Sequence, residues 1–255
     1  MTEPIFEGVG VALVTLFDEH GDIDTDATAE HAVCLVDLGV SAVVVAGSTG
    51  EASALDADER VALLEAVVAG VNGRVPVIAG TGAPSARQAG RLTAQAGEHG
   101  AAAALVLSPP GTDDPRRYYD AVAKAAPALP LLAYHFPSAS PPGIPVAVLP
   151  DLPVVGCKDS SGDPERLLEE LAGFDRPLFT GSSAVLALAG PLGCTGAILA
   201  LANVEPEDCI AAFGGDADAQ ARLTLPHLTA RRSFASGLKR LMAARFGTSA
   251  ATRMG

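Results

Sequence analysis

Short apolar runs rich in Val, Ile and Leu return about every 25 to 30 residues along this chain of 255 residues. The eight runs are Val9–Thr15, Ala42–Ala46, Val75–Ala79, Ala102–Leu107, Leu131–Tyr134, Val154–Cys157, Pro177–Thr180 and Gly196–Leu199. Each is continuously apolar rather than alternating, which is typical of parallel strands buried on both faces. The pattern therefore predicts eight buried parallel strands.

The stretches between these runs carry helix start signals. Asp56 to Glu59 resembles a capping box that opens a helix ending near Gly70. Further start signals are Pro84, Asp114 with Pro115, and Asp163 with Pro164. Eight strands alternating with helices favour an α/β chain folded as a (βα)8 TIM barrel. The alternative is an open doubly wound sheet, but no G-x-G-x-x-G follows the first run and the alternation is never broken.

The chain shows no linker with the composition of a domain boundary. We expect residues 1–210 to form the barrel and residues 211–246 to form a short C-terminal helical extension, with one or two amphipathic helices over 217–246. Residues 247–255 are small and polar, which predicts a flexible tail.

Charge and hydropathy exclude several classes of function. The net charge of −13 argues against nucleic-acid binding, which needs clustered Lys and Arg. No apolar run approaches the roughly 20 residues that span a bilayer, so no membrane partner is expected. The first seven residues carry acids and no basic segment, unlike a signal peptide. The chain is therefore expected to be cytoplasmic.

The four cysteines are scattered and form no C-x-x-C pair. They are Cys34, Cys157, Cys194 and Cys209. Each lies in an apolar context, which predicts buried free thiols rather than disulfides. No His, Asp or Glu cluster has the spacing of metal ligands, so no metal site is predicted.

Lys158 follows directly after the sixth apolar run. Burial at the end of a strand lowers the pKa of a lysine and makes its amine a nucleophile. The other lysines, Lys124 and Lys239, lie in helical stretches flanked by charges. The alternative for Lys158 is a side chain that reaches from the strand end to water.

Other polar side chains are predicted at the same face of the barrel, because reactive groups of this fold gather at the carboxyl ends of the strands. Tyr134 ends the fifth run, and neighbouring strands lie roughly 5 Å apart, which puts its phenol within reach of Lys158. Ser48 and Thr49 follow the second run in a glycine turn suited to a small carboxylate. An amine, a phenol and an anion cradle are what Schiff-base chemistry on a 2-oxo acid requires.

Each of these residues also has a structural interpretation. Tyr134 is equally suited to pack against a helix, and Ser48 and Thr49 are common turn residues. His135 is interpreted as a packed or capping histidine rather than a base. The functional interpretation depends on the conjunction of the residues at one end of one barrel.

Three stretches resemble, in order and spacing, the signatures of the dihydrodipicolinate synthase / N-acetylneuraminate lyase family of class I aldolases. They are Gly47–Glu51, Tyr134–Pro137 and Gly156–Gly162. The similarity continues through Gly181–Ser183, Gly193–Ile198 and Ala202–Val204, and it covers roughly residues 8 to 210. Three motifs in register indicate the family but not one member.

The resemblance implies a role for each reacting group. Lys158 would form a Schiff base with C2 of pyruvate or of a longer 2-oxo acid. Tyr134 would shuttle the proton, and Ser48 would orient the tyrosine. It also implies that no metal or organic cofactor takes part, because the protonated imine accepts the electrons.

The resemblance further implies a binding pocket for the 2-oxo acid. Ser48 and Thr49, in the turn that begins at Gly47, would cradle the carboxylate together with backbone amides. Gly181 and the carbonyl of Ile198 would line the pocket. The expected partners are thus pyruvate and an aldehyde, and a homodimer or homotetramer is the expected assembly.

Two departures from the family pattern bear on the substrate. Ala139 stands where dihydrodipicolinate synthases usually carry an arginine for the carboxylate of the aldehyde. Gly111 lies in a turn, Pro109–Thr112, that lacks the usual relay tyrosine. Both departures argue against lysine biosynthesis, and Pro137–Ser140 is more similar to the corresponding run of 2-keto-3-deoxygluconate aldolases.

The sequence therefore predicts a pyruvate-dependent class I aldolase that cleaves or makes a 2-keto-3-deoxy sugar acid. One alternative is 4-hydroxy-tetrahydrodipicolinate synthase, which condenses pyruvate with aspartate semialdehyde. The other is a 2-oxo acid binding barrel that has lost turnover, which the missing turn tyrosine motivates.

Overall fold

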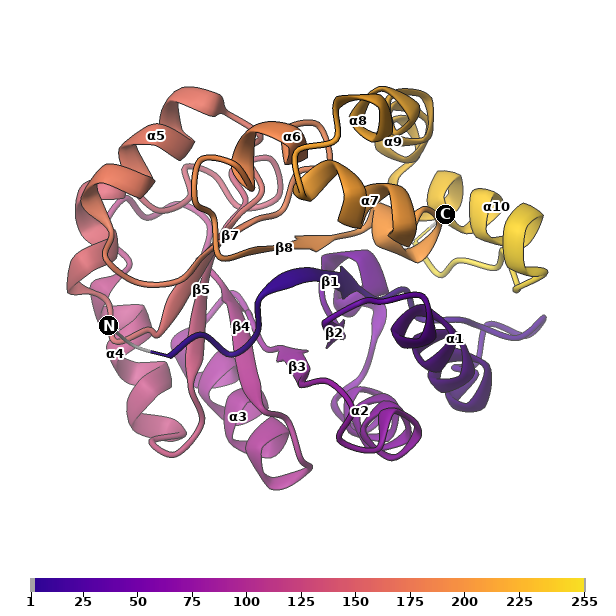
Figure 1. The fold of residues 1–255 in the computed structure, drawn as a ribbon. Coiled ribbons are helices and arrows are strands. Elements are labelled where there is room, and N and C mark those ends of the chain that lie inside the picture. Colours follow the sequence, from indigo (N-terminus) through magenta and orange to yellow (C-terminus); the bar gives the residue numbers. More distant parts are fainter. Residues whose placement is uncertain (1–2, 255) are drawn as a thin grey trace.

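Eight parallel strands close into a barrel in the computed structural model, which describes residues 3–254 (Figure 1). The strands are β1 Gly8–Ala12, β2 Ala42–Val45, β3 Val77–Gly80, β4 Ala103–Leu107, β5 Leu131–His135, β6 Gly156–Asp159, β7 Leu178–Thr180 and β8 Gly196–Leu199. They pair in chain order, and β1 pairs with β8 to close the barrel. This confirms the predicted (βα)8 TIM barrel.

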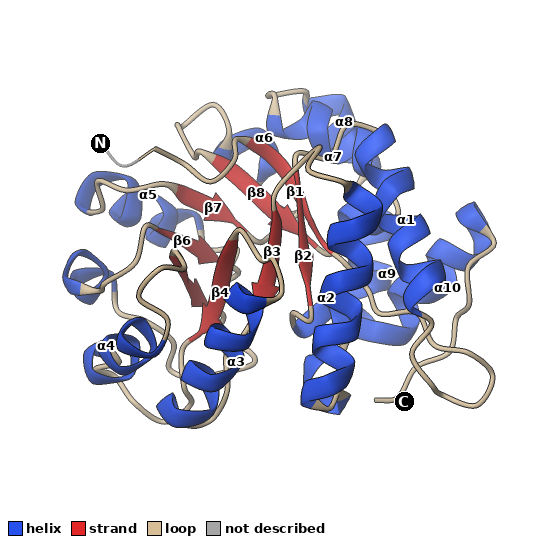
Figure 2. Cartoon of the chain, turned by 90° about the horizontal axis from the view of Figure 1, so that it is seen from below, coloured by secondary structure: helices blue, strands red, loops and turns tan. Residues whose placement is uncertain are grey.

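Helices follow most strands and surround them (Figure 2). They are α1 Thr25–Asp37, α2 Ala57–Val71, α3 Ala86–Glu98, α4 Arg116–Ala125, α5 Pro164–Gly173, α6 Leu186–Ala189 and α7 Pro206–Phe213. After β5 the connection contains a 3₁₀ helix, Val146–Asp151, in place of an α-helix. Beyond α7 come α8 Ala217–Arg222, α9 Thr224–Arg232 and α10 Phe234–Phe246, which lie on one side of the barrel (Figure 1).

Two of the predicted helix starts are confirmed. Asp56 and Glu59 form a capping box at α2, in which the Asp56 amide donates to the Glu59 carboxylate at 2.9 Å. Asp163 caps α5, and Pro164 occupies its first turn. A proline fits this position because its missing N–H has no partner inside the helix.

The other two start later than predicted. Helix α3 begins at Ala86 rather than Pro84, because the Ser85 hydroxyl accepts a hydrogen bond from the first turn and caps the helix. Helix α4 begins one residue after Pro115, and the Asp114 carboxylate accepts from its first amide at 3.2 Å. The proline therefore precedes the helix instead of opening it.

The core has an inner and an outer layer. The inner layer fills the barrel with side chains from the strands: Ala12, Ala42, Val44, Ile78, Ala103, Leu105, Leu132, Tyr134, Phe179 and Ile198. Phe6 stacks on Phe179 with ring centroids 4.7 Å apart and fills the end that precedes the strands. A Cβ on Gly10 would lie 3.0 Å from the Phe6 ring, so glycine makes room for this aromatic pair. Two further clusters fill the space between barrel and helices.

The C-terminal region differs from the prediction in two ways. The expected boundary at residue 210 falls inside α7, and the extension contains three helices rather than one or two. Residues 247–255 were predicted to form a flexible tail, and within this segment Arg253 makes long-range contacts with the barrel. The Arg253 side chain donates to Gly21 O at 2.6 Å and binds both carboxylate oxygens of Glu59. The ion pair between Arg253 and Glu59 therefore anchors the segment.

Within residues 3–254, the structure contains no helix with the length and apolar character needed to span a bilayer.

Candidate active site

Lys158 lies inside β6 rather than after it. The strand extends to Asp159 because Lys158 pairs in register with Tyr134 on β5 and with Phe179 on β7. The side chain is only 4% exposed, and no carboxylate of the described residues forms a salt bridge with it. Burial in this apolar setting lowers the pKa of Lys158 from 10.5 to about 7. A large fraction of the amine is therefore neutral and nucleophilic at neutral pH.

Tyr134 is the nearest aromatic neighbour of Lys158. The lysine nitrogen lies 4.4 Å from the centroid of the Tyr134 ring. Burial raises the pKa of Tyr134 to about 12, and hydrogen bonds from the side chains of Ser160 and Ser48 only partly oppose this effect. The Ser160 hydroxyl lies 3.4 Å from the phenol oxygen. Tyr134 is consequently a neutral phenol with hydroxyl partners, placed beside an amine.

The residues predicted to cradle a carboxylate form a tight turn after β2. Ser48–Gly50 is a single 3₁₀ turn that begins after Gly47, and within it the Thr49 side chain is buried. Ala46 and Glu51 flank the turn with φ values of 51° and 54°. Left-handed backbone costs a residue other than glycine of order 1–3 kcal/mol, so the surrounding structure must hold this turn in place.

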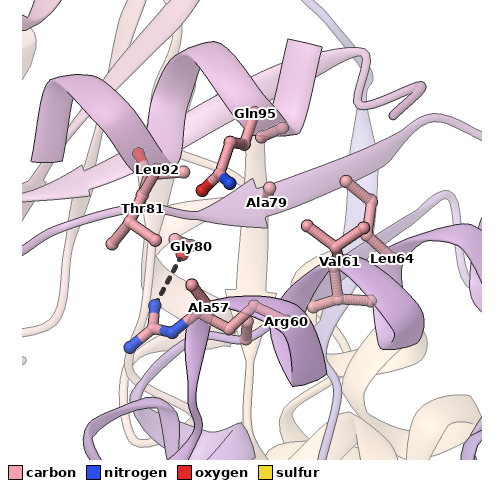
Figure 3. Close-up of a pocket in the computed structure, with 12 residues that line it drawn as sticks. Ala57, Arg60, Val61, Leu64, Ala79, Gly80, Thr81, Leu92 and Gln95 are labelled. Atoms are coloured by element: carbon pink, nitrogen blue, oxygen red, sulfur yellow. Dashed lines mark hydrogen bonds between the residues drawn. The ribbon is translucent and has the colours of Figure 1, made fainter. Parts of the chain in front are cut away.

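Two groups donate hydrogen bonds to the turn and to the residues that follow it. The Thr15 hydroxyl, which follows β1, donates to Gly50 O at 2.7 Å. The Arg60 guanidinium on α2 donates to the carbonyls of Ala52 and Leu55, just beyond the turn. Arg60 also donates to Gly80 O at 3.4 Å and borders a cavity of about 20 Å³ between the strands and helices α2 and α3 (Figure 3). This cavity has room for one water and lies outside the barrel wall, so it is separate from the Lys158 site.

Gly181 and Ile198 complete the set of predicted residues. A Cβ on Gly181 would lie 2.8 Å from Lys158 Cε, so the loop after β7 reaches the lysine only because a glycine stands there. Ile198 on β8 is fully buried in the inner layer of the core with Tyr134. The structure thus brings Lys158, Tyr134, Ser48 and Gly181 into one cluster.

Sequence reasoning missed two residues that support Tyr134. The Tyr119 hydroxyl on α4 donates to Val106 O at 2.8 Å and accepts from the Tyr134 amide at 3.4 Å. Tyr119 lies on a helix, whereas the site residues were predicted from their positions at the ends of strands, so its sequence position did not indicate a role. The second residue is Ser160, and its position directly after the lysine strand was the signal that could have found it.

The outer face of the same two strands carries a second polar group. His135 Nδ1 accepts from the Ile144 amide at 2.8 Å, which confirms a packed histidine, and burial lowers its pKa to about 4. Beside it, Arg166 lies 3.3 Å from Asp159 and 2.7 Å from Glu170. These charges lie under α5, on the opposite side of the barrel wall from Lys158.

Among residues 3–254, no group of three or more His, Cys, Asp or Glu is placed to hold a metal ion.

The loops that surround the mouth of the barrel carry no positive side chain. Ala139 and Gly111 are both exposed, and the Gly111 amide donates to Pro141 O at 2.8 Å, which joins the loops after β4 and β5. The eight loops that follow the strands are residues 13–24, 46–56, 81–85, 108–115, 136–145, 160–163, 181–185 and 200–205. All are described by the structure, and none contains Lys or Arg, whereas most contain Asp or Glu.

A buried amine of lowered pKa lies against a neutral phenol near a hydroxyl turn, inside a TIM barrel, and these are the groups that Schiff-base chemistry on a 2-oxo acid requires. The chain belongs to the dihydrodipicolinate synthetase family, which it matches over residues 5–242. Members of this family are carbon–carbon lyases that use a Schiff-base lysine, and this chain is therefore an enzyme of that type. The resemblance seen in the motifs is confirmed.

Individual relatives are similar over most of their length. The 4-hydroxy-tetrahydrodipicolinate synthase of Pseudomonas aeruginosa is 37% identical over 83% of this chain and 77% of its own. An uncharacterized DapA-like lyase of Halobacterium salinarum is 37% identical over 78% of this chain and 68% of its own. Among solved structures, dihydrodipicolinate synthase DapA-2 of Bacillus anthracis has a TM-score of 0.90 at 27% identity, covering 100% of this chain and 93% of its own. YagE of E. coli K12, solved with pyruvate, has a TM-score of 0.89 at 25% identity, covering 98% and 92%.

Proposed function

We propose that this enzyme cleaves a 2-keto-3-deoxy sugar acid into pyruvate and an uncharged hydroxylated aldehyde, or runs the same reaction in the direction of condensation. The observation that carries the proposal is the absence of Lys and Arg from the eight loops after the strands. A carboxylate on the aldehyde would find no Lys or Arg on these loops, and the turn at Ser48 and Thr49 is already assigned to the carboxylate of the 2-oxo acid. A polyhydroxy aldehyde carries no such charge.

In the first stage, the neutral amine of Lys158 attacks C2 of the 2-oxo acid. The adduct loses its C2 oxygen as water and becomes a protonated imine. Tyr134 is the group positioned to donate the proton that the departing oxygen needs, because its phenol stays protonated at neutral pH. Ser48 and Thr49 hold the carboxylate with the backbone amides of their turn.

In the second stage, the proton of the C4 hydroxyl leaves and the C3–C4 bond breaks. The electron pair of that bond moves to C3 and the imine nitrogen, which gives an enamine, and the aldehyde departs. Tyr134 relays the hydroxyl proton, and protonation of C3 followed by addition of water releases pyruvate and regenerates Lys158. Condensation follows the same steps in reverse.

A second candidate is 4-hydroxy-tetrahydrodipicolinate synthase. Its support is the name of the Pseudomonas aeruginosa relative at 37% identity. This function requires another residue to bind the carboxylate of aspartate semialdehyde, because Ala139 offers no charge. The DapA-like lyase of Halobacterium salinarum, at equal identity, has a name that does not specify the substrate.

A substrate panel separates these functions. The purified enzyme is assayed for pyruvate release from 2-keto-3-deoxy sugar acids and for pyruvate consumption with aspartate semialdehyde, with Lys158→Met as the inactive control. Release from a sugar acid supports the proposal. Turnover with aspartate semialdehyde alone contradicts it in favour of the synthase, and pyruvate binding without turnover of either substrate indicates a binding barrel.

We further propose that the enzyme assembles as a homodimer or homotetramer. Large apolar side chains exposed on the C-terminal extension, among them Leu225 at 73% and Phe234 at 43%, support an association surface. Sedimentation velocity at micromolar concentration measures the assembly. A single species of 25.7 kDa contradicts this proposal.

A further inference from the structure

Glu51, the residue after the carboxylate turn, is a buried acid that the proposed reaction does not use. Its side chain is 0% exposed, and its backbone amide donates to Ser48 O at 3.2 Å, which closes the 3₁₀ turn. A carboxylate without water is stable in a protein only when several donors surround it. The structure shows where those donors come from.

All the hydrogen bonds to the Glu51 carboxylate come from the C-terminal region in the described part of the chain. Lys239 Nζ on α10 donates to Oε1 at 2.7 Å, and the amides of Arg253 and Met254 donate to Oε2 at 2.9 and 2.8 Å. Lys239 also donates to Ala251 O at 2.7 Å. One carboxylate therefore joins helix α10, segment 251–254 and the turn.

Lys239 is as buried as Lys158, but its surroundings differ. Its nitrogen lies 4.3 Å from the centroid of the Phe17 ring and forms an ion pair with Glu51. Burial lowers the pKa of Lys239, and the hydrogen bond and charge of Glu51 oppose that effect. Lys158 has no such partner among the described residues. Lys239 is thus a structural cation, whereas Lys158 is poised as a nucleophile.

The geometry points to Glu51 as a positioning residue for the turn that binds the carboxylate of the 2-oxo acid, with Lys239 and segment 251–254 as its anchors. This inference rests on the proposed function. The turn has left-handed backbone at Ala46 and Glu51, so it needs external contacts to keep its amides and hydroxyls aimed at the ligand. Glu51 links the turn to α10 and to segment 251–254, in addition to the hydrogen bond that Thr15 donates to Gly50 O.

The substitution Glu51→Gln tests this with little change of shape. Glutamine has one acceptor oxygen, so it must turn its NH₂ group either toward Lys239 or toward the amides of Arg253 and Met254, all of which are donors. One anchor is lost in either case. A second variant, Lys239→Met, removes the other side of the pair. The matched control is Arg245→Met, on the same helix, whose guanidinium binds Glu205 and Glu207 instead.

The measurement is the rate of reductive trapping at Lys158 as a function of ligand concentration, with pyruvate and with acetone, a methyl ketone that lacks the carboxylate. In Glu51→Gln and Lys239→Met, we expect the half-saturating pyruvate concentration to rise roughly tenfold, as loss of a hydrogen bond to a charged group implies. The trapping rate with acetone is expected to stay near that of the wild type. Arg245→Met should match the wild type with both ligands.

Equal losses with pyruvate and acetone would show that Glu51 only supports the fold, and unchanged half-saturation would show that it does not act on the turn. Either result overturns the inference while leaving the proposed function intact. Failure of the wild-type enzyme to trap pyruvate overturns both. Thermal melts identify a variant that does not fold, and the other variant then carries the comparison.

Discussion

Tyr134 and Lys158 are register partners on adjacent parallel strands, and the lysine nitrogen lies 4.4 Å from the centroid of the tyrosine ring. Both side chains point into the barrel, because residues in register on neighbouring strands face the same side of a sheet. Burial lowers the pKa of the amine to about 7 and raises that of the phenol to about 12. The nucleophile is therefore free of its proton in the same pH range in which the phenol keeps its own.

Replacing Lys158 by methionine should stabilise the folded protein below pH 7. The folded-state pKa of about 7 lies below the usual 10.5, so the unfolded chain binds more protons between these values and stability rises with pH across that window. The shift corresponds to roughly 5 kcal/mol of destabilisation at low pH. Urea unfolding should show the largest advantage of Lys158→Met at pH 6 and little at pH 10. Lys124→Met, at an exposed position on α4, should show no such trend.

The rate of Schiff-base formation should follow the titration of Lys158. Only the neutral amine attacks a carbonyl, so the rate of trapping by cyanoborohydride at limiting pyruvate should rise through pH 7 and level off above pH 8. A rate that continues to rise to pH 10 would indicate a lysine with an ordinary pKa. That result would contradict the lowered pKa.

Tyr134→Phe should lower kcat by about a hundredfold or more, since it removes the group that transfers protons. Its effect on the KM of the 2-oxo acid substrate should be small, because the turn at Ser48 and Thr49 holds the carboxylate. Steady-state kinetics on the active substrate measures both. Tyr118→Phe is the matched control, since the Tyr118 hydroxyl exchanges hydrogen bonds with the backbone of Ala83. An equal loss of kcat in both variants would argue against a relay through Tyr134.

Asn203 should be important for stability rather than chemistry. Its side chain is fully buried, accepts from the Val14 amide at 3.1 Å and donates to Ala12 O at 2.7 Å, which joins the ends of β1 and β8. Asn203→Ala leaves both backbone groups buried without a partner, which should lower the free energy of unfolding by about 3 kcal/mol. Urea unfolding measures this loss. Arg222→Ala, which breaks an exposed ion pair with Asp208, should change it by less than about 1 kcal/mol, and an equal effect would refute the assignment.

The strands could be predicted because continuous apolar runs have one stable environment, between two layers of side chains. Lys158 could be found for the same reason, since a lysine beside such a run is exceptional. That Lys158 lies inside β6 could not be predicted from the sequence, because pairing with Tyr134 and Phe179 determines the length of that strand.

Lys239 shows where local sequence fails. Its neighbours are charged and helical and gave no signal of burial, yet it is fully buried against an acid 188 residues earlier in the chain. The contacts of segment 251–254 could not be predicted for a similar reason. Its hydrogen bonds to Glu51 and Glu59 join residues far apart in the sequence, and composition does not indicate them. Both cases involve ion pairs between distant parts of the sequence, Lys239 with Glu51 and Arg253 with Glu59, which no local pattern encodes.

The central claim is that Lys158 is the Schiff-base nucleophile, and the most direct test is reduction with borohydride in the presence of pyruvate, followed by intact mass and peptide mapping. We predict one reduced pyruvyl group per chain on the peptide that contains Lys158, and no addition in Lys158→Met. An unmodified wild-type mass, or a label on Lys124 or Lys239, would contradict the account.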